Sequence, residues 1–310
     1  MTERVTAERA AEIYESTKQW GRWGEADERG ALNLLTPEVV ARAATLARKG
    51  SVVSCGRRLA TRPAPDNFSP ALHFMAPAGD VVGTGHPNDL QSTGDFVGVA
   101  FHGMAVSHID ALCHVFVERQ MWNGFSADDV TSRGAKRNSI AAAFGGITGR
   151  GVLLDIPRLR GVEWVEPGDA ITADELEAAR EAEAVELESG DIVLISTGRD
   201  ARRAVHGAWD LSEGLAGLDP ECVPWLAEKD LALLGSDGVS DPLPGSAHAW
   251  SMPVHQCMLV GLGVHLLDNL QLDRLAAACA EEQKWEFLFT VAPLHIGGGT
   301  GSPVNPIAVL

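Results

Sequence analysis

The sequence of 310 residues lacks any run of eighteen apolar residues, so no membrane-spanning helix is predicted. Positive charge is also scarce, because 25 Lys and Arg face 42 Asp and Glu and the formal net charge is −17. A surface of that sign would repel phosphates, which argues against nucleic-acid binding. We therefore expect neither a membrane nor a nucleic acid as a partner.

Cysteines are few, and their spacing is not that of a metal finger. The five are Cys55, Cys113, Cys222, Cys257 and Cys279. Buried, reduced thiols in a reducing cytoplasm are the expected state of such a set. The first eight residues also lack the basic and apolar regions of a secretory signal. Both features favour a cytoplasmic protein.

What is present is an ordinary globular composition, with 45% hydrophobic and 22% charged residues, which excludes disorder as the main state. Apolar patterning and turn residues predict irregularly alternating strands and helices, hence one α/β domain. The expected strands are 51–55, 95–101, 151–155, 191–196, 231–234, 264–267 and 285–291. Helices are expected from Thr36-Pro37 to Gly50, from a capping box at Thr172, from Asp219-Pro220, and over 254–262. Residues 61–94, rich in Pro, Gly, Asp and Asn, predict a long irregular loop that is either functional or disordered.

The densest group of chemically active residues is His102, His108, Asp110 and His114, which lie within thirteen residues between apolar runs. If the chain is extended from His108 to Asp110, the two side chains share one face of the strand, about 6.5 Å apart. Imidazole and carboxylate could then converge on one divalent ion. The alternative is that the histidines are half-buried and Asp110 caps the next turn.

Several segments resemble the cyclase family of kynurenine formamidases and isatin hydrolases, in particular its longer members. His108-Ile-Asp110-Ala-Leu-Cys-His114 is similar to the central part of that family's H-x-G-T-H-x-D-x-P-x-H motif. Further similar segments are 20–37, Gly190-Asp-Ile-Val-Leu-Ile-Ser-Thr-Gly198, the stretch from His255 to Leu270, and Gly299-Thr-Gly-Ser-Pro-Val-Asn-Pro306. The resemblance thus covers most of the chain in ordered patches.

The resemblance implies an α/β fold of the swivelling β/β/α type, with mixed sheets and flanking helices. It also implies one cyclase-like hydrolase domain over 1–310, with an N-terminal helical extension over about 1–50. Such proteins are commonly oligomeric, here a dimer or tetramer. They hydrolyse small amides, lactams or lactones with a divalent metal.

Carried over to this sequence, the resemblance makes His108, Asp110, His255 and Asp268 metal ligands and His114 the catalytic histidine. Four departures accompany it. Met104 stands at the family's first histidine, which His102 can replace only if the backbone kinks at Gly103. The other three are Ser107 for threonine, Leu112 for proline and Asp268 for glutamate. The number of bound ions stays open.

Other candidates receive structural interpretations. Asp237-Gly-Val-Ser-Asp241 is interpreted as a polar turn after a strand. Gly297-Gly-Gly-Thr-Gly301 has no following Gly-Lys-Ser/Thr and is not a phosphate loop. We interpret Trp122, Trp250 and Cys113 as packing residues. His206, His248 and His295 are expected to face solvent.

The sequence therefore predicts a hydrolase that uses zinc or manganese on the carbon–nitrogen bond of a small-molecule amide or cyclic amide. His114 would act as the acid and base. A lactone hydrolase or cyclase at the same site is one alternative. A catalytically silent member that binds a small ligand is another.

Overall fold

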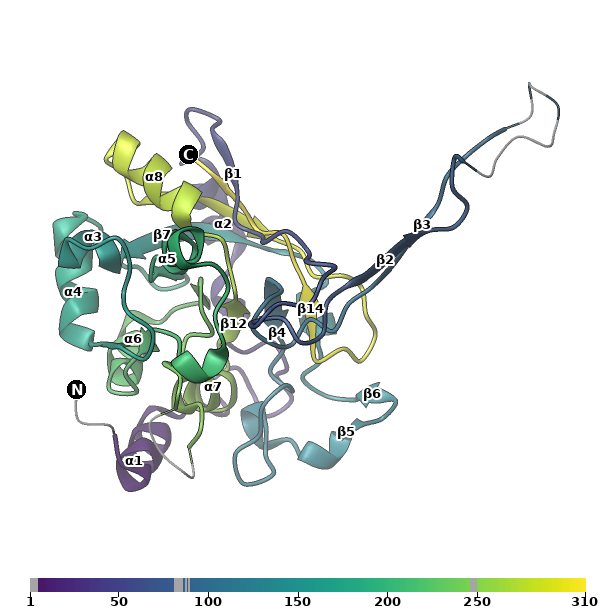
Figure 1. The fold of residues 1–310 in the computed structure, drawn as a ribbon. Helices are drawn as coiled ribbons and strands as arrows, with labels where there is room; N and C mark the ends of the chain where they lie inside the picture. Colours follow the sequence, from purple (N-terminus) through teal and green to yellow (C-terminus); the bar gives the residue numbers. More distant parts are fainter. Residues whose placement is uncertain (1–4, 81–85, 87, 89, 246–249) are drawn as a thin grey trace.

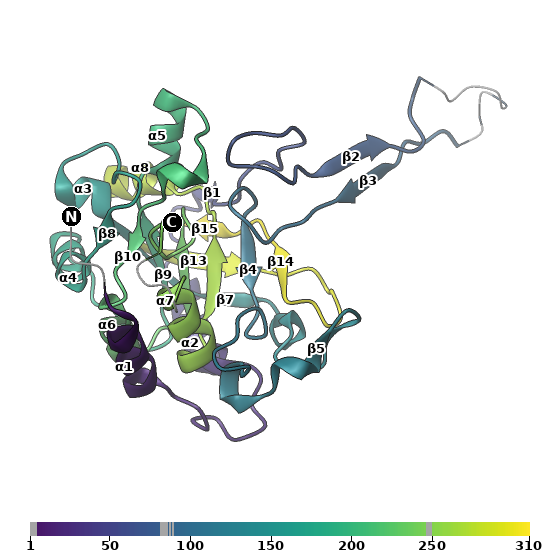
Figure 2. The same ribbon diagram turned by 60° about the horizontal axis from the view of Figure 1, so that its bottom comes forward.

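A computed structural model describes residues 5–80, 86, 88, 90–245 and 250–310. Its largest element is a mixed sheet of nine strands in the order β1-β15-β13-β7-β9-β11-β12-β4-β14 (Figures 1 and 2). In that order the strands are Val52–Ser54, Ile307–Val309, Glu286–Val291, Ile147–Asp155, Ile192–Ser196, Leu233–Ser236, His265–Asp268, His108–Asp110 and Gly301–Pro303. The predicted mixed α/β fold is confirmed.

The centre of this sheet is parallel and buried. Strands β7, β9, β11 and β12 pair in parallel, and β9 and β11 are buried along their whole length. Continuous apolar runs such as Ile192-Val-Leu-Ile195 suit strands covered on both faces. Beyond β12 the direction reverses, because β4 pairs antiparallel with both β12 and β14. The carboxyl end of β12 therefore lies beside the start of β4.

Helices flank the sheet. They are α1 Ala7–Thr17, α2 Pro37–Ala44, α3 Ile156–Arg160, α4 Ala173–Ala182, α5 Arg199–His206, α6 Cys222–Lys229, α7 Pro253–His255, the π-helix η6 Gln256–Leu262 and α8 Asp273–Glu282. Both α2 and α4 pack against β7, and α1 packs against η6. No helix in the described part of the chain is long and apolar enough to cross a bilayer.

Short 3₁₀ turns and strand pairs fill the connections. The turns are Gly30–Leu34, Trp122–Gly124, Ala127–Asp129, Ile140–Ala143 and Leu211–Glu213. The short pairs are β8 Ala170–Ile171 with β10 Gly217–Leu218, and β5 Val130–Thr131 with β6 Gly134–Ala135.

Local signals placed most element starts correctly. Thr36 caps α2 by accepting a hydrogen bond from the Val39 amide, and Thr172 forms the predicted capping box with Glu175. The end of α2 was predicted too late, at Gly50. The amides of Thr45 and Leu46 bond three residues back to Arg42 and Ala43, which tightens the last turn and ends the helix.

The segment 61–94 was wrongly predicted to be irregular throughout. It contains β2 Leu72–Met75, which pairs antiparallel with β3 Asp95–Gly98. The second strand is shorter than the predicted 95–101 and stays outside the nine-stranded sheet. Together the two strands form an arm that projects from the rest of the molecule (Figure 1). The residues of β2 are exposed along its whole length and carry no burial pattern from which that strand could be predicted.

The predicted packing residues are in the core. Trp122 is fully buried and its indole nitrogen donates to Asp27, and Trp250 is also buried. All five cysteines are buried and unpaired. His206 and His295 are exposed, and His248 lies outside the described residues.

Candidate metal centre

The junction of β4 and β12 brings four strand positions to one place. In the antiparallel register His108 faces Asp268 and Asp110 faces Leu266. Directly paired residues point to the same face of a sheet, as do residues two apart, so His108, Asp110 and Asp268 share a face. All three are at most 2% exposed. The extended conformation that the sequence suggested for 108–110 is present as β4.

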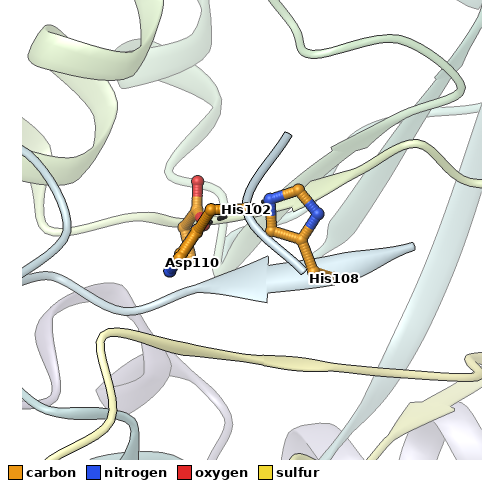
Figure 3. A group of neighbouring side chains, drawn as sticks. All are labelled: His102, His108 and Asp110. Carbon is orange, nitrogen blue, oxygen red and sulfur yellow. Dashed lines mark ion pairs between the residues drawn. The ribbon is translucent and has the colours of Figure 1, made fainter. Parts of the chain in front are cut away.

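Asp110 lies at the middle of the group, and its two carboxylate oxygens have different neighbours. Oδ1 is 3.0 Å from His102 Nδ1 and 3.4 Å from His108 Nε2. Oδ2 is 3.8 Å from His255 Nε2 and 3.9 Å from His114 Nε2. Figure 3 shows His102 and His108 beside Asp110.

His255 joins the group from the last residue of α7. Its Nε2 is 3.1 Å from Asp268 Oδ2. Its Nδ1 is 2.6 Å from Asp241 Oδ2, and the same carboxylate accepts hydrogen bonds from the backbone amides of Val254 and His255. Such a contact fixes which ring nitrogen carries the proton and leaves Nε2 facing the other ligands.

Asp241 was not assigned this role from the sequence. Its segment does follow β11, but Asp241 is fully buried and bound to His255 rather than part of a solvated turn. The only signal in the sequence is an acidic residue soon after a buried strand. That pattern does not reveal contact with a histidine fourteen residues later.

The backbone kink that His102 needs is also present. Gly103 has φ +146°, a conformation that L side chains rarely adopt. The ring of His102 stacks on that of His114 with centroids 3.8 Å apart, and its Nε2 is 2.9 Å from Thr300 Oγ1. The structure therefore brings together all six predicted site residues, His102, His108, Asp110, His114, His255 and Asp268.

The glycine-rich segment that precedes β14 also belongs to this neighbourhood. Gly301 pairs with Asp110, and a Cβ at Gly301 would lie 2.4 Å from the Ile109 carbonyl oxygen. Only glycine permits this approach of the two backbones.

Electrostatics distinguish the histidines. Burial lowers the pKa of His114 to about 4, assisted by the positive charges of His102 and His255 and opposed by Asp110. Burial would also lower the pKa of His255, but Asp268 and Asp241 raise it well above the usual value. For Asp110, burial is outweighed by His102 and His108, which hold the pKa of its carboxyl far below the usual range. The ring of His114 is thus neutral near pH 7.

The donor set fits a divalent cation. Two groups have ligand atoms within 4.8 Å of one another, His102 with His108 and Asp110, and Asp110 with His255 and Asp268. Both oxygens of Asp110, one oxygen of Asp268 and Nδ1 of His102 are buried without a hydrogen-bond partner in the described residues. Unpaired buried polar atoms are costly, and a cation would satisfy them. A mixed set of imidazole nitrogens and carboxylate oxygens suits several divalent metals, among them zinc, manganese and iron.

A cavity of about 280 Å³ opens onto this group. Its apolar wall consists of Met104, Val115, Phe116, Val239 and Met252. His108, Asp110, His114, His255 and Asp268 form the polar side. This volume is near the lower limit for small-molecule sites and suits a small, partly apolar ligand.

Comparisons with known proteins agree with this geometry. A family model described as "Putative cyclase" matches residues 27–241. A crystal structure of a novel cyclase is 30% identical, with a TM-score of 0.84, and the match covers 96% of this chain and 99% of that one. The search of curated proteins returned no match.

Two isatin hydrolases share the fold at lower identity. One, bound to the product analogue thioisatinate, is 21% identical with a TM-score of 0.60, over 89% of this chain and 99% of that one. Isatin hydrolase A from Ralstonia solanacearum is 24% identical with a TM-score of 0.56, over 88% and 98%.

Proposed function

Because this chain belongs to the cyclase family, we propose that it is a metal-dependent hydrolase that cleaves the carbon–nitrogen bond of a small amide or cyclic amide. The observation that carries the proposal is the environment of Asp110. This buried carboxylate has histidines on both oxygens, no hydrogen-bond donor in the described residues, and a small cavity beside it.

His102, His108, Asp110, His255 and Asp268 would hold the ion, zinc or manganese. When bound, the ion would polarise the substrate carbonyl and lower the pKa of a water molecule to about 7. Asp241 would keep His255 in the ligating tautomer through the contact at Nδ1.

His114 would move the proton. Its low pKa keeps the ring neutral near pH 7, so Nε2 can accept a proton from water and pass it to the departing nitrogen. Stacking on His102 holds the ring in place. The apolar wall around Phe116 and Met252 would take up the substrate's hydrocarbon part and exclude water.

Metal content and turnover, measured on the same preparations, test the proposal. Formyl-anilides, isatin-like lactams and lactones are offered with zinc or manganese added back. His108→Ala and Asp110→Ala should each lose the metal. His114→Ala should retain it and lose about 10²- to 10⁴-fold in rate.

Four outcomes separate the alternatives. Joint loss of metal and activity in His114→Ala would make His114 a ligand. Normal turnover in that variant would exclude both roles. A wild-type protein that cleaves only lactones would move the reaction to carbon–oxygen bonds. A protein that binds no metal after gentle purification would be a silent small-ligand binder.

We also propose that the protein assembles as a dimer or tetramer of identical chains through the β2–β3 arm. Leu72, Phe74 and Val97 are each more than half exposed, and Phe74 stacks on Phe96 with centroids 4.7 Å apart. An isolated two-stranded ribbon is marginally stable in water, and burial of its apolar residues against another chain would stabilise it. Light scattering should give a multiple of the 32.9 kDa chain mass, reduced by Phe74→Ser with Phe96→Ser. A monomeric wild-type protein would contradict the proposal.

A further inference from the structure

The turn over residues 102–106 carries His102 into the metal group and leads into His108. It contains the kink at Gly103, where a Cβ would meet no atom within 4 Å. Side-chain packing at Gly103 therefore does not hold the kink. A glycine backbone is the least constrained of all residues, so something else must fix the conformation of this turn.

Asn269, directly after β12, contacts the turn through its side-chain amide. Its Nδ2 donates to the Gly103 carbonyl at 2.7 Å and to the Val106 carbonyl at 3.3 Å. Asn269 is fully buried, and its backbone N–H donates to the Gly238 carbonyl at 2.7 Å. The donor is therefore itself held rigidly by the loop after β11.

Arg199, the first residue of α5, reaches the same turn by two routes. Its Nη2 donates to the Met104 carbonyl at 2.6 Å, and its Nη1 donates to Asn269 Oδ1 at 2.7 Å. Nη1 also donates to the Asp237 carbonyl at 3.1 Å, and only 4% of the residue is exposed. Asn269 and Arg199 thus satisfy the carbonyls of Gly103, Met104 and Val106.

The contact at Val106 extends this control to a second ligand. The Val106 carbonyl also accepts from His108 Nδ1 at 2.8 Å, which leaves His108 Nε2 facing Asp110. The position of one carbonyl in the turn therefore sets the orientation of His108, while the kink sets that of His102.

We propose that Arg199 and Asn269 are positioning residues that hold the 102–106 turn, so that His102 and His108 face Asp110 together. The proposal rests on the proposed function for the presence of an ion, but the positioning itself is a property of the metal-free chain. It also accounts for the use of His102 although Met104 stands at the position that resembles the family's first histidine. The displaced histidine needs a kinked backbone, and the two side chains hold that kink.

The main variant is Asn269→Asp, which keeps size and the acceptor for Arg199 but replaces the donor facing Gly103 and Val106 with an oxygen. Arg199→Lys is the second variant, because position 199 lies far from Asp268 in the sequence. Lysine keeps the positive charge but can replace only one of the two hydrogen bonds, to the Met104 carbonyl or to Asn269 Oδ1. Asp200→Asn is the matched control. Asp200 pairs with Arg57 in the same buried network, and no contact of its side chain with the turn is seen among the described residues.

Co²⁺ is the probe, and its affinity and visible absorption spectrum are the readouts, with His102→Ala as the reference. Asn269→Asp should bind Co²⁺ about 10- to 100-fold more weakly, with the spectral change of His102→Ala. Arg199→Lys should show a smaller change of the same kind, and Asp200→Asn should match the wild type. Folded Asn269→Asp and Arg199→Lys proteins with wild-type affinity and spectrum would overturn the proposal.

Nitrogen-15 NMR of the histidine rings in the metal-free proteins tests the positioning role separately from the proposed metal-dependent function. It uses Arg199→Lys, so the test remains possible if Asn269→Asp folds poorly. At a pH above the raised pKa of His108, where the ring is neutral, the wild type should show one tautomer, protonated on Nδ1, and Arg199→Lys should show a mixture. A single unchanged tautomer in Arg199→Lys would overturn the positioning role. If the wild type binds no Co²⁺ but Arg199→Lys still shows the mixture of tautomers, only the proposed function is overturned.

Discussion

Asp110 and Asp237 are both almost completely buried, but their surroundings differ in kind. Asp237, after β11, accepts hydrogen bonds from the backbone amides of Thr197, Gly198 and Arg199 and from the Thr197 hydroxyl. Asp110, on β4, has no such donor among the described residues and faces imidazole nitrogens instead.

The difference shows how a structural carboxylate can be told from one that is free for a ligand. Backbone amides cannot lose their protons, so Asp237 is permanently satisfied and ties the start of α5 to β11. Histidines can lose theirs, so the partners of Asp110 can exchange a proton for a cation. Burial and an acidic side chain are common to both residues; the type of donor distinguishes them.

The largest effect should come from exchanging each carboxylate for its amide. Asp237→Asn places an NH₂ group against backbone N–H donors and should destabilise the metal-free protein by about 3 kcal/mol or more. Asp110→Asn should cost less than Asp237→Asn, because Asp110 accepts no hydrogen bond from a backbone amide in the described residues. Urea unfolding with a chelator present measures both.

The two variants should rank in the opposite order when their effect on metal binding, rather than on stability, is measured. Asp110→Asn should lose the ion, and Asp237→Asn should retain it well below its unfolding temperature. Equal destabilisation by the two changes would show that Asp110 is also a structural carboxylate.

A smaller effect is expected at Asp241, which combines both kinds of partner. Its carboxylate accepts from two backbone amides and from His255 Nδ1. Asp241→Asn should weaken zinc binding about 10- to 100-fold, or about 1.4 to 2.8 kcal/mol, because His255 becomes a poorer ligand. Competition with a chromophoric chelator measures the affinity. Ser240→Ala is the control, since the Ser240 hydroxyl has no partner in the described residues, and it should leave the affinity unchanged.

A separate, pH-dependent effect concerns a third buried carboxylate that resembles neither of the others. Glu183 accepts one hydrogen bond from the Asp155 amide, and its other oxygen has no partner in the described residues. Burial, together with the nearby charge of Asp155, raises the pKa of Glu183 from 4.5 to about 8. Between these values the folded state binds a proton that the unfolded state has lost. Stability should therefore be highest below about pH 4.5 with respect to this group and fall as pH rises to 8.

Glu183→Gln should remove that pH dependence. Because glutamine stays neutral, the melting temperature of the variant should rise relative to that of the wild type as the pH increases from 5 to 9. The difference between the two proteins isolates Glu183 from other titrating groups. A constant difference across this range would contradict the raised pKa.

Local sequence signals predicted the elements whose residues carry their own pattern. The Thr36 cap, the capping box at Thr172 and the apolar run at 192–195 each led to a helix or strand at the expected place. Strand β3 was predicted as part of 95–101, but β2 and its pairing with β3 were missed because the residues of β2 are exposed and carry no burial pattern. The cluster of His102, His108, Asp110 and His114 was found from its density in the sequence. The resemblance to the cyclase family added His255 and Asp268 and gave His114 its catalytic role.

The sequence by itself therefore determined the α/β class, the family resemblance, and which histidines and aspartates were candidates. The tertiary structure decided their relations, because residues 110, 241 and 255 meet only through the pairing of β4 with β12 and the loop after β11. It also decided that His102 lies in the group, through the kink at Gly103 and its hydrogen-bonded turn. Hydrogen bonds and carboxylate contacts depend on distances of a few ångströms between residues far apart in the chain. No local pattern encodes those distances.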